Sequence, residues 1–325
     1  MPSVIRAITL LALPVLLMAG PAAAQEAYPN KPVRIIVPFA PSGPADLIAR
    51  VVAQKLSEDL GKQFYIESHA GAGGNTGTGL AARAPADGYT LLITSQALVI
   101  NAGLYKTLPY DTFKDFVAVT RMATTPNVLV VNPSVPANTV GELVALMRKA
   151  PDKYNSYAQP GIGTPAHLSG ELFKLSQKIN LTSIPFGGGG PMVQSVVGGH
   201  TPIAFSSLAP ATALIQSGKI RALAVTADRR DASLPDVPTM AEAGFPNQIG
   251  ETPIGILVPA GTPQAIVDLL HRKVAQIVTM PDVKQKLAAI GFTPIGDTPA
   301  EFTAFLKAEE AKWAKVINEA GIKLP

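Results

Sequence analysis

Short runs of hydrophobic residues alternate along the chain with longer segments in which hydrophobic residues recur every three or four positions. The first pair is the apolar run at 33–37 and the segment 45–60, where Ile48, Val52 and Leu56 share one face. A short apolar run is typical of a buried strand, and the second spacing predicts an amphipathic helix. Strands that alternate with helices predict a largely parallel sheet with helices on its faces.

The same alternation continues through the rest of the chain. We expect further strands at 64–67, 91–93, 128–131, 155–158, 184–186, 203–205, 219–226 and 254–258. We expect further helices at 74–84, 140–149, 166–175, 191–197 and 263–278, and a last helix that follows Thr298. Thr298-Pro299-Ala300-Glu301 has the spacing of a capping box, which marks the start of that helix.

The order of these elements predicts two lobes. We place the first lobe at residues 25–124 and 250–325, formed from both ends of the chain, and the second at 125–249. Two strands, near 117–131 and 249–258, then connect the lobes. Two connections of this kind form a hinge, and a cleft between hinged lobes is a common position for a ligand.

The first 24 residues have the pattern of an export signal. Arg6 precedes an apolar stretch at 8–19, and Ala22-Ala23-Ala24 supplies small residues for cleavage before Gln25. The apolar stretch is shorter than the roughly 20 residues that a membrane-spanning helix needs. We therefore expect residues 1–24 to be a cleaved signal peptide and the protein to reach the periplasm of a Gram-negative cell.

The composition excludes some kinds of site and ligand. The chain has no cysteine, so it forms no disulfide and no thiolate metal site. Its formal net charge is only +4, and charged residues make up 15% of the chain, against about 25% in an average globular protein. A small charge that is evenly spread does not indicate nucleic-acid binding.

Motifs for catalysis, cofactors and metals are missing. The glycines from Gly71 on do not fit a dinucleotide fingerprint, because the third glycine would fall on Thr76, and no phosphate-binding loop occurs. The four histidines form no H-x-x-x-H pair, and no G-x-S-x-G segment is present. We expect no cofactor, no metal and no enzymatic activity, although a triad assembled only in space stays open.

Four turns rich in Gly and Pro lie between a strand and a helix, at 39–44, 71–77, 159–165 and 186–191. Such a turn leaves the first N–H groups of the helix unpaired. Together with the positive end of the helix dipole, these groups bind anions without Lys or Arg. For each turn, plain helix capping or chain reversal is the alternative.

His167 lies in the first turn of the helix that Thr164 is expected to cap. The positive end of that helix disfavours the imidazolium. We expect a neutral His167 that donates one hydrogen bond, with an ordinary packing role as the alternative.

Several segments, in order along the chain, resemble the substrate-binding proteins of tripartite tricarboxylate transporters, the Bug family. They are 28–39, 71–77, 84–92, 167–173, 197–200, 218–225 and 235–239. The resemblance implies an α/β, two-lobed periplasmic binding protein fold (type II-like), with two parallel-type sheets flanked by helices and a two-strand hinge. It implies a solute receptor that binds a small carboxylate through backbone N–H groups and bridging waters. The receptor would deliver this ligand to a two-component membrane permease.

The chain departs from the family pattern at three places. Ser42 stands where a glycine is common, and Phe186-Gly187 stands where many relatives have Tyr-Lys. Ser206 and Ser207 follow Phe205, where an acidic residue is common. These differences favour a larger or more apolar carboxylate, such as an aromatic acid, over an amino acid, and a dicarboxylate stays open.

We therefore expect a monomeric receptor that closes on its ligand. The expected contacts from the first lobe are Phe39, Ala40, Ser42, Gly74, Asn75, Thr76, Ser95 and Gln96. Those from the second lobe are Gly161, Gly163, Thr164, His167, Gly187, Gly188 and Ser206. A sensor that signals through a membrane kinase would use the same cleft, and a periplasmic hydrolase is a further alternative.

Overall fold

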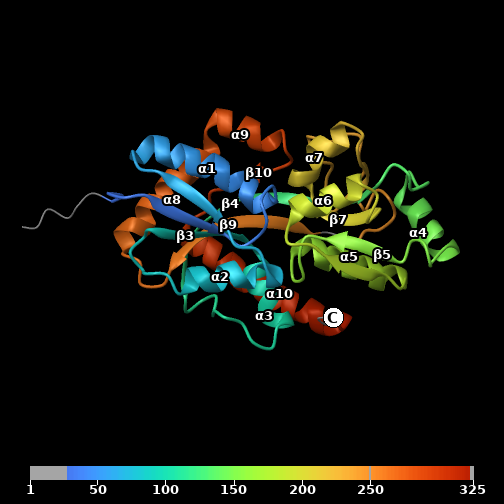
Figure 1. Cartoon of the computed structure of the whole chain (residues 1–325), viewed down its shortest axis with the longest axis horizontal. Coiled ribbons are helices and arrows are strands. Elements are labelled where there is room, and N and C mark those ends of the chain that lie inside the picture. The colour runs from blue at the N-terminus through green and yellow to red at the C-terminus, as the bar shows by residue number, and fades with distance from the viewer. Residues whose placement is uncertain (1–27, 249, 323–325) are drawn as a thin grey trace, which may run out of the picture.

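Figure 1 shows the computed structural model of the protein, which describes residues 28–248 and 250–322. The predicted signal peptide at 1–24 lies outside the described residues. The strands are β1 Val33–Val37, β2 Phe64–Ser68, β3 Thr90–Ser95, β4 Phe116–Val131, β5 Ser156–Gln159, β6 Thr182–Pro185, β7 Ile203–Ser207, β8 Arg221–Val225, β9 Glu251–Pro259 and β10 Thr293–Pro294. The α-helices are α1 Pro44–Leu60, α2 Asn75–Ala82, α3 Ala97–Leu104, α4 Val140–Lys149, α5 Pro165–Gln177, α6 Gly189–Val197, α7 Leu208–Gln216, α8 Gln264–Thr279, α9 Pro281–Ala288 and α10 Pro299–Ala320. A short 3₁₀ helix, Ala72–Gly74, precedes α2.

The strands follow the order β2-β1-β3-β9-β4-β7-β5-β6, with β8 and β10 also pairing with β4. Strand β4 pairs with β9 as far as Pro126 and with β7 from Asn127 on. The chain therefore passes from the first lobe, which contains β1 to β3, to the second, which contains β5 to β7, within one strand (Figure 1). The lobe boundaries at 124/125 and 249/250 stay predictions, and this change of partner supports the first of them.

Strand direction differs between the outer strands and the strands that connect the lobes. Strands β1, β2 and β3 are parallel, as are β5, β6 and β7. Strand β9 runs antiparallel to both β3 and β4. The parallel arrangement expected from the sequence thus holds only among β1 to β3 and among β5 to β7. Strands β7 and β8 run antiparallel to β4, so the sheet as a whole is mixed. Strand β4 leaves the first lobe and β9 returns to it, so these two strands run in opposite directions.

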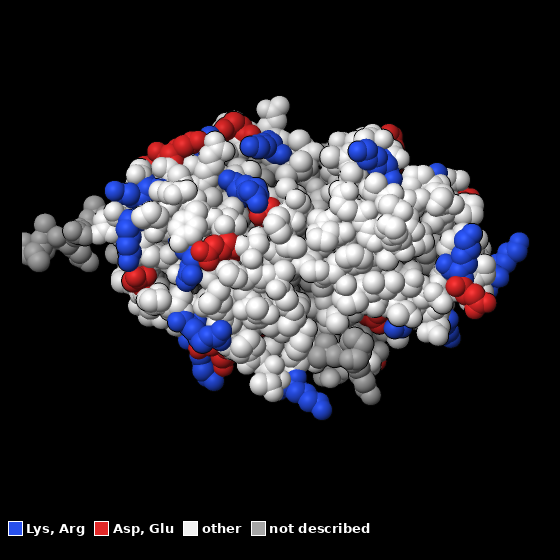
Figure 2. Space-filling model, in the orientation of Figure 1, with Lys and Arg blue, Asp and Glu red and all other residues white. Residues whose placement is uncertain are grey.

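Charged side chains lie mainly toward the two ends of the molecule in the view of Figure 2. The middle of this face, where the lobes meet, carries few of them (Figure 2). Within the described part of the chain, no helix is long and apolar enough to cross a membrane.

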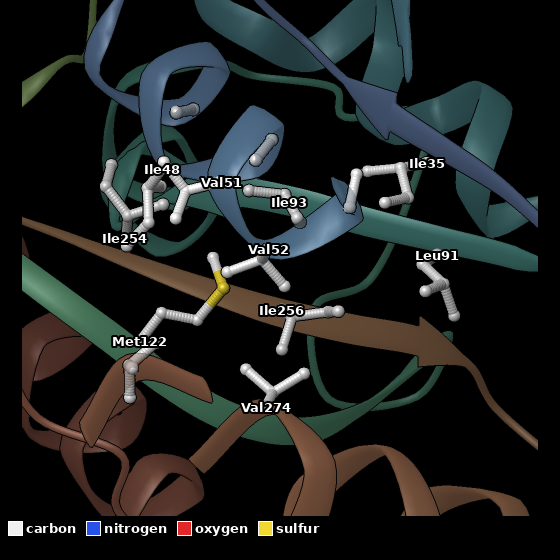
Figure 3. Close-up of a cluster of buried hydrophobic side chains, with 14 of the residues drawn as sticks. Ile35, Ile48, Val51, Val52, Leu91, Ile93, Met122, Ile254, Ile256 and Val274 are labelled. Carbon is white, nitrogen blue, oxygen red and sulfur yellow. The ribbon is translucent and has the colours of Figure 1, made fainter. Parts of the chain in front are cut away.

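The core of the first lobe lies between α1, α8 and the sheet. Ile48 and Val52 of α1 face Ile93 of β3 and Ile256 of β9, and Val274 of α8 closes the cluster from the other side (Figure 3). All five side chains are fully buried, which stabilises the fold by about 1.5–3 kcal/mol for each. This core holds the ends of β1 and β3 rigidly at the cleft.

The core of the second lobe combines aliphatic side chains with a small aromatic group. Phe205 of β7 lies between Tyr157 of β5 and Phe173 of α5, with ring centroids 5.8 Å and 5.5 Å away. Tilted and edge-to-face contacts of this kind are the favoured geometry for aromatic pairs. They hold α5 against β7.

The C-terminal helix also joins the lobes. Trp313 and Ile317 of α10 form one buried cluster with Ile100 of α3 and Leu168 of α5. Leu168 belongs to the second lobe, so α10 connects the lobes in addition to the two strands expected from the sequence.

Most of the expected elements are present, and the capping box at Thr298 and Glu301 is confirmed. Helices α3, α7 and α9 and the short strand β10 were not predicted. The first five residues of α3 are all buried, so the helix has no polar face there to reveal its period. The connecting strand expected near 117–131 is present as β4, and the polar residues 124–127 lie inside it.

Candidate functional site

Four helices begin around one small chamber between the lobes. We call it the inner chamber, and its free space holds little more than one water-sized group. Its walls include Pro44 and Ala45 at the start of α1, Pro165 and Ala166 at the start of α5, Gly188 and Gly189 at the start of α6, and Ser207, which precedes α7. The remaining walls are Phe39, Ser95, Pro160, Thr164, Thr252 and Ile254.

The electrostatics of the inner chamber favour an anion. Each helix start carries unpaired N–H groups and a partial positive charge. Pro44 and Pro165 have no N–H, so the first donors of α1 and α5 are Ala45 and Ala166, and both line the chamber. None of its described wall residues is charged. Backbone dipoles therefore supply the positive potential.

Ser207 is a hydroxyl of the inner chamber whose oxygen has no hydrogen-bond partner in this structure. Its side chain is 2% exposed, and its Oγ has no hydrogen-bond partner. The hydroxyl of Thr252, by contrast, donates to Asn127 Oδ1 at 2.7 Å, and that of Thr164 donates to Gly161 O at 2.6 Å. A buried hydroxyl without a partner is costly, so Ser207 is poised to donate to a bound oxygen atom.

A second, larger space adjoins the first. This outer chamber has a volume of about 300 Å³ and is lined by Phe39, Gly71, Ala72, Gly73, Gly74, Tyr105, Pro160, Gly161, Ile162, Pro185, Phe186 and Gly187. Phe39 and Pro160 line both chambers, so they form the wall between them. Among the described residues that line the outer chamber there is again no Lys, Arg, His, Asp or Glu.

The lobes touch directly at the edge of the inner chamber. Ala40 N of the first lobe donates to Gly187 O of the second at 2.8 Å. A Cβ added at Gly188 would lie 2.9 Å from Ala40 N, and one added at Gly190 would lie on the carbonyl of Pro41. The cleft is therefore closed in this structure, and glycines allow the close approach of the two backbones.

The structure brings seven of the fifteen expected site residues to the chamber walls. Phe39, Ser95, Thr164 and Gly188 line the inner chamber, and Phe39, Gly74, Gly161 and Gly187 line the outer one. Ala40 and Gly163 instead contact the opposite lobe at the closed cleft. All these residues come from the glycine-rich turns except Ser95, which ends β3.

The remaining expected residues do not line either chamber. The Asn75 side chain turns into the first lobe, where its Oδ1 accepts from Asn101 Nδ2 at 2.7 Å and from the Tyr110 hydroxyl at 3.0 Å. Ser206 Oγ donates to Ser207 O at 2.7 Å, so it holds its own strand end. Three further residues also lie outside the walls: Ser42 and Thr76 are exposed, and Gln96 donates to Glu251 O at 3.3 Å.

His167 also lies outside the chambers, beside the turn that lines them. Its Nδ1 accepts from Gly163 N at 3.2 Å, so the neutral ring carries its proton on Nε2, and the donated hydrogen bond expected from the sequence stays a prediction. Burial lowers the pKa of His167 to about 4, with a smaller opposing effect of Glu171. The ring is thus neutral, as expected, but desolvation rather than the helix dipole is the main cause.

Sequence reasoning missed several wall residues, above all Ser207 and Thr252. Ser207 carried the same signal as the other turns, a strand end before a helix, but α7 was not recognised as a helix. Thr252 has no local signal, because its place at the chamber follows from the position of β9 in the sheet. Within the described residues, no group of three or more His, Cys, Asp or Glu could hold a metal ion.

Comparison with known proteins agrees with this geometry. The family model described as "Tripartite tricarboxylate transporter family receptor" (TctC) matches residues 48–322. Protein BugT of Bordetella pertussis is 36% identical over 309 residues, which cover 94% of each chain. A solved structure from R. palustris with adipate has a TM-score of 0.88 and 35% identity, covering 91% of this chain and 99% of that one. MatC from Rhodopseudomonas palustris with bound malate has a TM-score of 0.84 and 29% identity, covering 89% and 100%. The chain belongs to the tripartite tricarboxylate transporter family of receptors, periplasmic solute-binding proteins of the TctC or Bug type.

Proposed function

We propose that this protein is an extracytoplasmic receptor that binds a small organic carboxylate in the inner chamber and delivers it to a two-component membrane permease. One observation carries the proposal: four helix starts and the unpartnered Ser207 hydroxyl surround a space with no charged wall residue. Such a site binds a compact anion through many hydrogen bonds from the backbone.

The proposed mechanism is a shift between open and closed forms. The inner chamber takes walls from both lobes, since α1 belongs to the first lobe and α5, α6 and α7 to the second. A ligand that contacts both lobes binds the closed form more tightly and so increases its population. The permease would then recognise the closed, loaded form in the periplasm, where the predicted signal peptide directs the chain.

The known ligands of relatives support the choice of a carboxylate. Two solved relatives were determined with adipate and with malate, and both ligands are carboxylates. The solute-binding family is also consistent with capture and release of an unchanged ligand rather than turnover.

Calorimetry and thermal shift on the chain from Gln25 on test the proposal. The panel contains mono-, di- and tricarboxylates, aromatic acids and amino acids, and the methyl ester of each binding acid is the matched control. We expect at least one carboxylate to raise the melting temperature with increasing concentration, while its uncharged ester does not. Equal binding of acid and ester, or no binding by any acid, would contradict the proposal.

A further inference from the structure

The two chambers differ in their size and in the groups that line them. The inner chamber offers the donors of four helix starts, and its free space is small, so at most the carboxylate end of a ligand enters it. Because Phe39 and Pro160 separate the chambers, the rest of any longer ligand must pass them into the outer chamber.

The outer chamber offers mainly apolar walls. Phe39, Ile162 and Phe186 face it, and Pro160 and Pro185 extend the apolar surface. No described wall residue carries a positive charge. The N–H groups of Gly74 and Thr76 at the start of α2 already donate to Gly71 O. A second carboxylate placed here would therefore lose part of its hydration without gaining a cation or these backbone donors, which is unfavourable.

Tyr105 supplies a neutral polar group at the outer chamber. Its side chain is half-buried, and burial raises the pKa of its hydroxyl, which therefore stays protonated. A phenol of this kind stacks on a flat apolar group or donates to a neutral oxygen atom. The Tyr105 hydroxyl therefore favours an uncharged group in the part of the ligand that lies in the outer chamber, which we call the tail.

We propose that this receptor selects monocarboxylates with an apolar or aromatic tail over dicarboxylates, with the carboxylate in the inner chamber and the tail in the outer one. The inference rests on the proposed function. It sets this chain apart from the relatives solved with adipate and malate, which each carry two carboxylates.

Gly187 gives the inference a direct test. It lines the outer chamber and is exposed, and a Cβ added there would meet only the Ala70 Cβ, at an ordinary distance of 3.7 Å. Its contact with the first lobe uses its carbonyl oxygen, which accepts from Ala40 N and which a side chain leaves in place. Gly187→Lys therefore adds a cation to the outer chamber without displacing the backbone.

The experiment measures dissociation constants by calorimetry for two matched pairs, benzoate with terephthalate and hexanoate with adipate. In the wild type we expect the monocarboxylate of at least one pair to bind about tenfold more tightly than its dicarboxylate. In Gly187→Lys we expect this ratio to fall by about tenfold, because the new ammonium pairs with the second carboxylate. Gly187→Met, of similar length and uncharged, should keep the wild-type ratio.

The outcomes separate this inference from the proposed function. Dicarboxylates that bind the wild type as tightly as their partners would overturn the inference and leave the carboxylate receptor in place. If Gly187→Lys and Gly187→Met changed the ratio of the two dissociation constants equally, the tail would not lie in the outer chamber beside Gly187. If no carboxylate of the whole panel bound, the proposed function would fail and the inference with it.

Discussion

The hydroxyl of Thr252 donates a 2.7 Å hydrogen bond to Asn127 Oδ1 at the point where the chain passes between the lobes. Asn127 is fully buried, and its Nδ2 donates in turn to Ser169 Oγ of α5 at 3.1 Å. The two connecting strands and α5 are thus held together by one side chain. Because Thr252 also lines the inner chamber, the same contact positions the hinge and the site.

Thr252→Val should destabilise the protein by about 1–3 kcal/mol, because it leaves the buried Asn127 Oδ1 without this donor. Denaturant unfolding measures the change. Thr124→Val is the matched control, since the Thr124 hydroxyl donates to the Glu251 carboxylate at an exposed position of the same hinge. Equal effects of the two substitutions would contradict a special role for the buried contact.

Ser207→Ala should weaken binding of a carboxylate by about tenfold, the value of one hydrogen bond to a charged group. It should leave the stability of the empty protein unchanged or raise it, because Ser207 Oγ has no hydrogen bond to lose and its burial without a partner is costly. Calorimetry and unfolding measure the two effects separately. The neighbouring Ser206→Ala should show the reverse, a loss of stability with little change in affinity, since Ser206 Oγ donates to the backbone.

Gly188→Ala should oppose closure of the cleft. Its backbone is extended, with φ 162°, so alanine is not strained there, but its Cβ would lie 2.9 Å from Ala40 N in the closed form. We expect weaker ligand binding and a smaller ligand-induced decrease of the radius of gyration, measured by small-angle X-ray scattering. Gly187→Ala, which meets only Ala70 at 3.7 Å, should behave like the wild type. A normal contraction of Gly188→Ala would argue against this contact as the limit on closure.

Stability should decrease as the pH falls from about 6.5 toward 4, in part because of His167. Burial lowers its pKa from 6.5 to about 4 in the folded protein, so the folded state favours the neutral ring. The contribution is complete above pH 6.5 and is lost as the pH falls to the folded pKa. Its full size is about 3 kcal/mol, since each pH unit between the two pKa values corresponds to about 1.4 kcal/mol.

His167→Asn isolates this contribution. Asparagine keeps an acceptor near the position of Nδ1 for the Gly163 N–H group, but it does not titrate. Unfolding free energies measured between pH 4 and 7 should therefore decrease less steeply in the variant. Parallel curves for the variant and the wild type would show that the ring is not the titrating group.

Much of the site was visible in the sequence because its signals are local. The turns at 39–44, 159–165 and 186–191 each place Gly or Pro at a helix start, and these three starts do meet at the inner chamber. Thr164 was expected as an N-cap, and its hydroxyl accepts from His167 N. Caps and turns depend on residues within a few positions of one another, so a sequence reveals them.

The sequence did not predict which side chains point toward the ligand space. Asn75 was expected at the ligand because it begins a helix after a glycine turn, yet Asn101 and Tyr110, far along the chain, bind its side chain inside the first lobe. Ser207 faces the chamber while Ser206, the residue proposed from the sequence, does not. Adjacent strand residues point to opposite faces, and only the packed sheet decides which face meets the cleft.

The sequence alone therefore determined the alternation of strands and helices, the division into two lobes joined by strands, and the helix starts that give the site its charge preference. These follow from hydrophobic period, turn residues and capping, which act over short distances along the chain. Only the tertiary structure decided that β4 changes its partner from β9 to β7 at Asn127, that α7 adds a fourth helix start, and that Phe39 and Pro160 lie between two chambers. Those features depend on contacts between residues distant in sequence, such as Asn127 with Thr252, whose pairing no local pattern specifies.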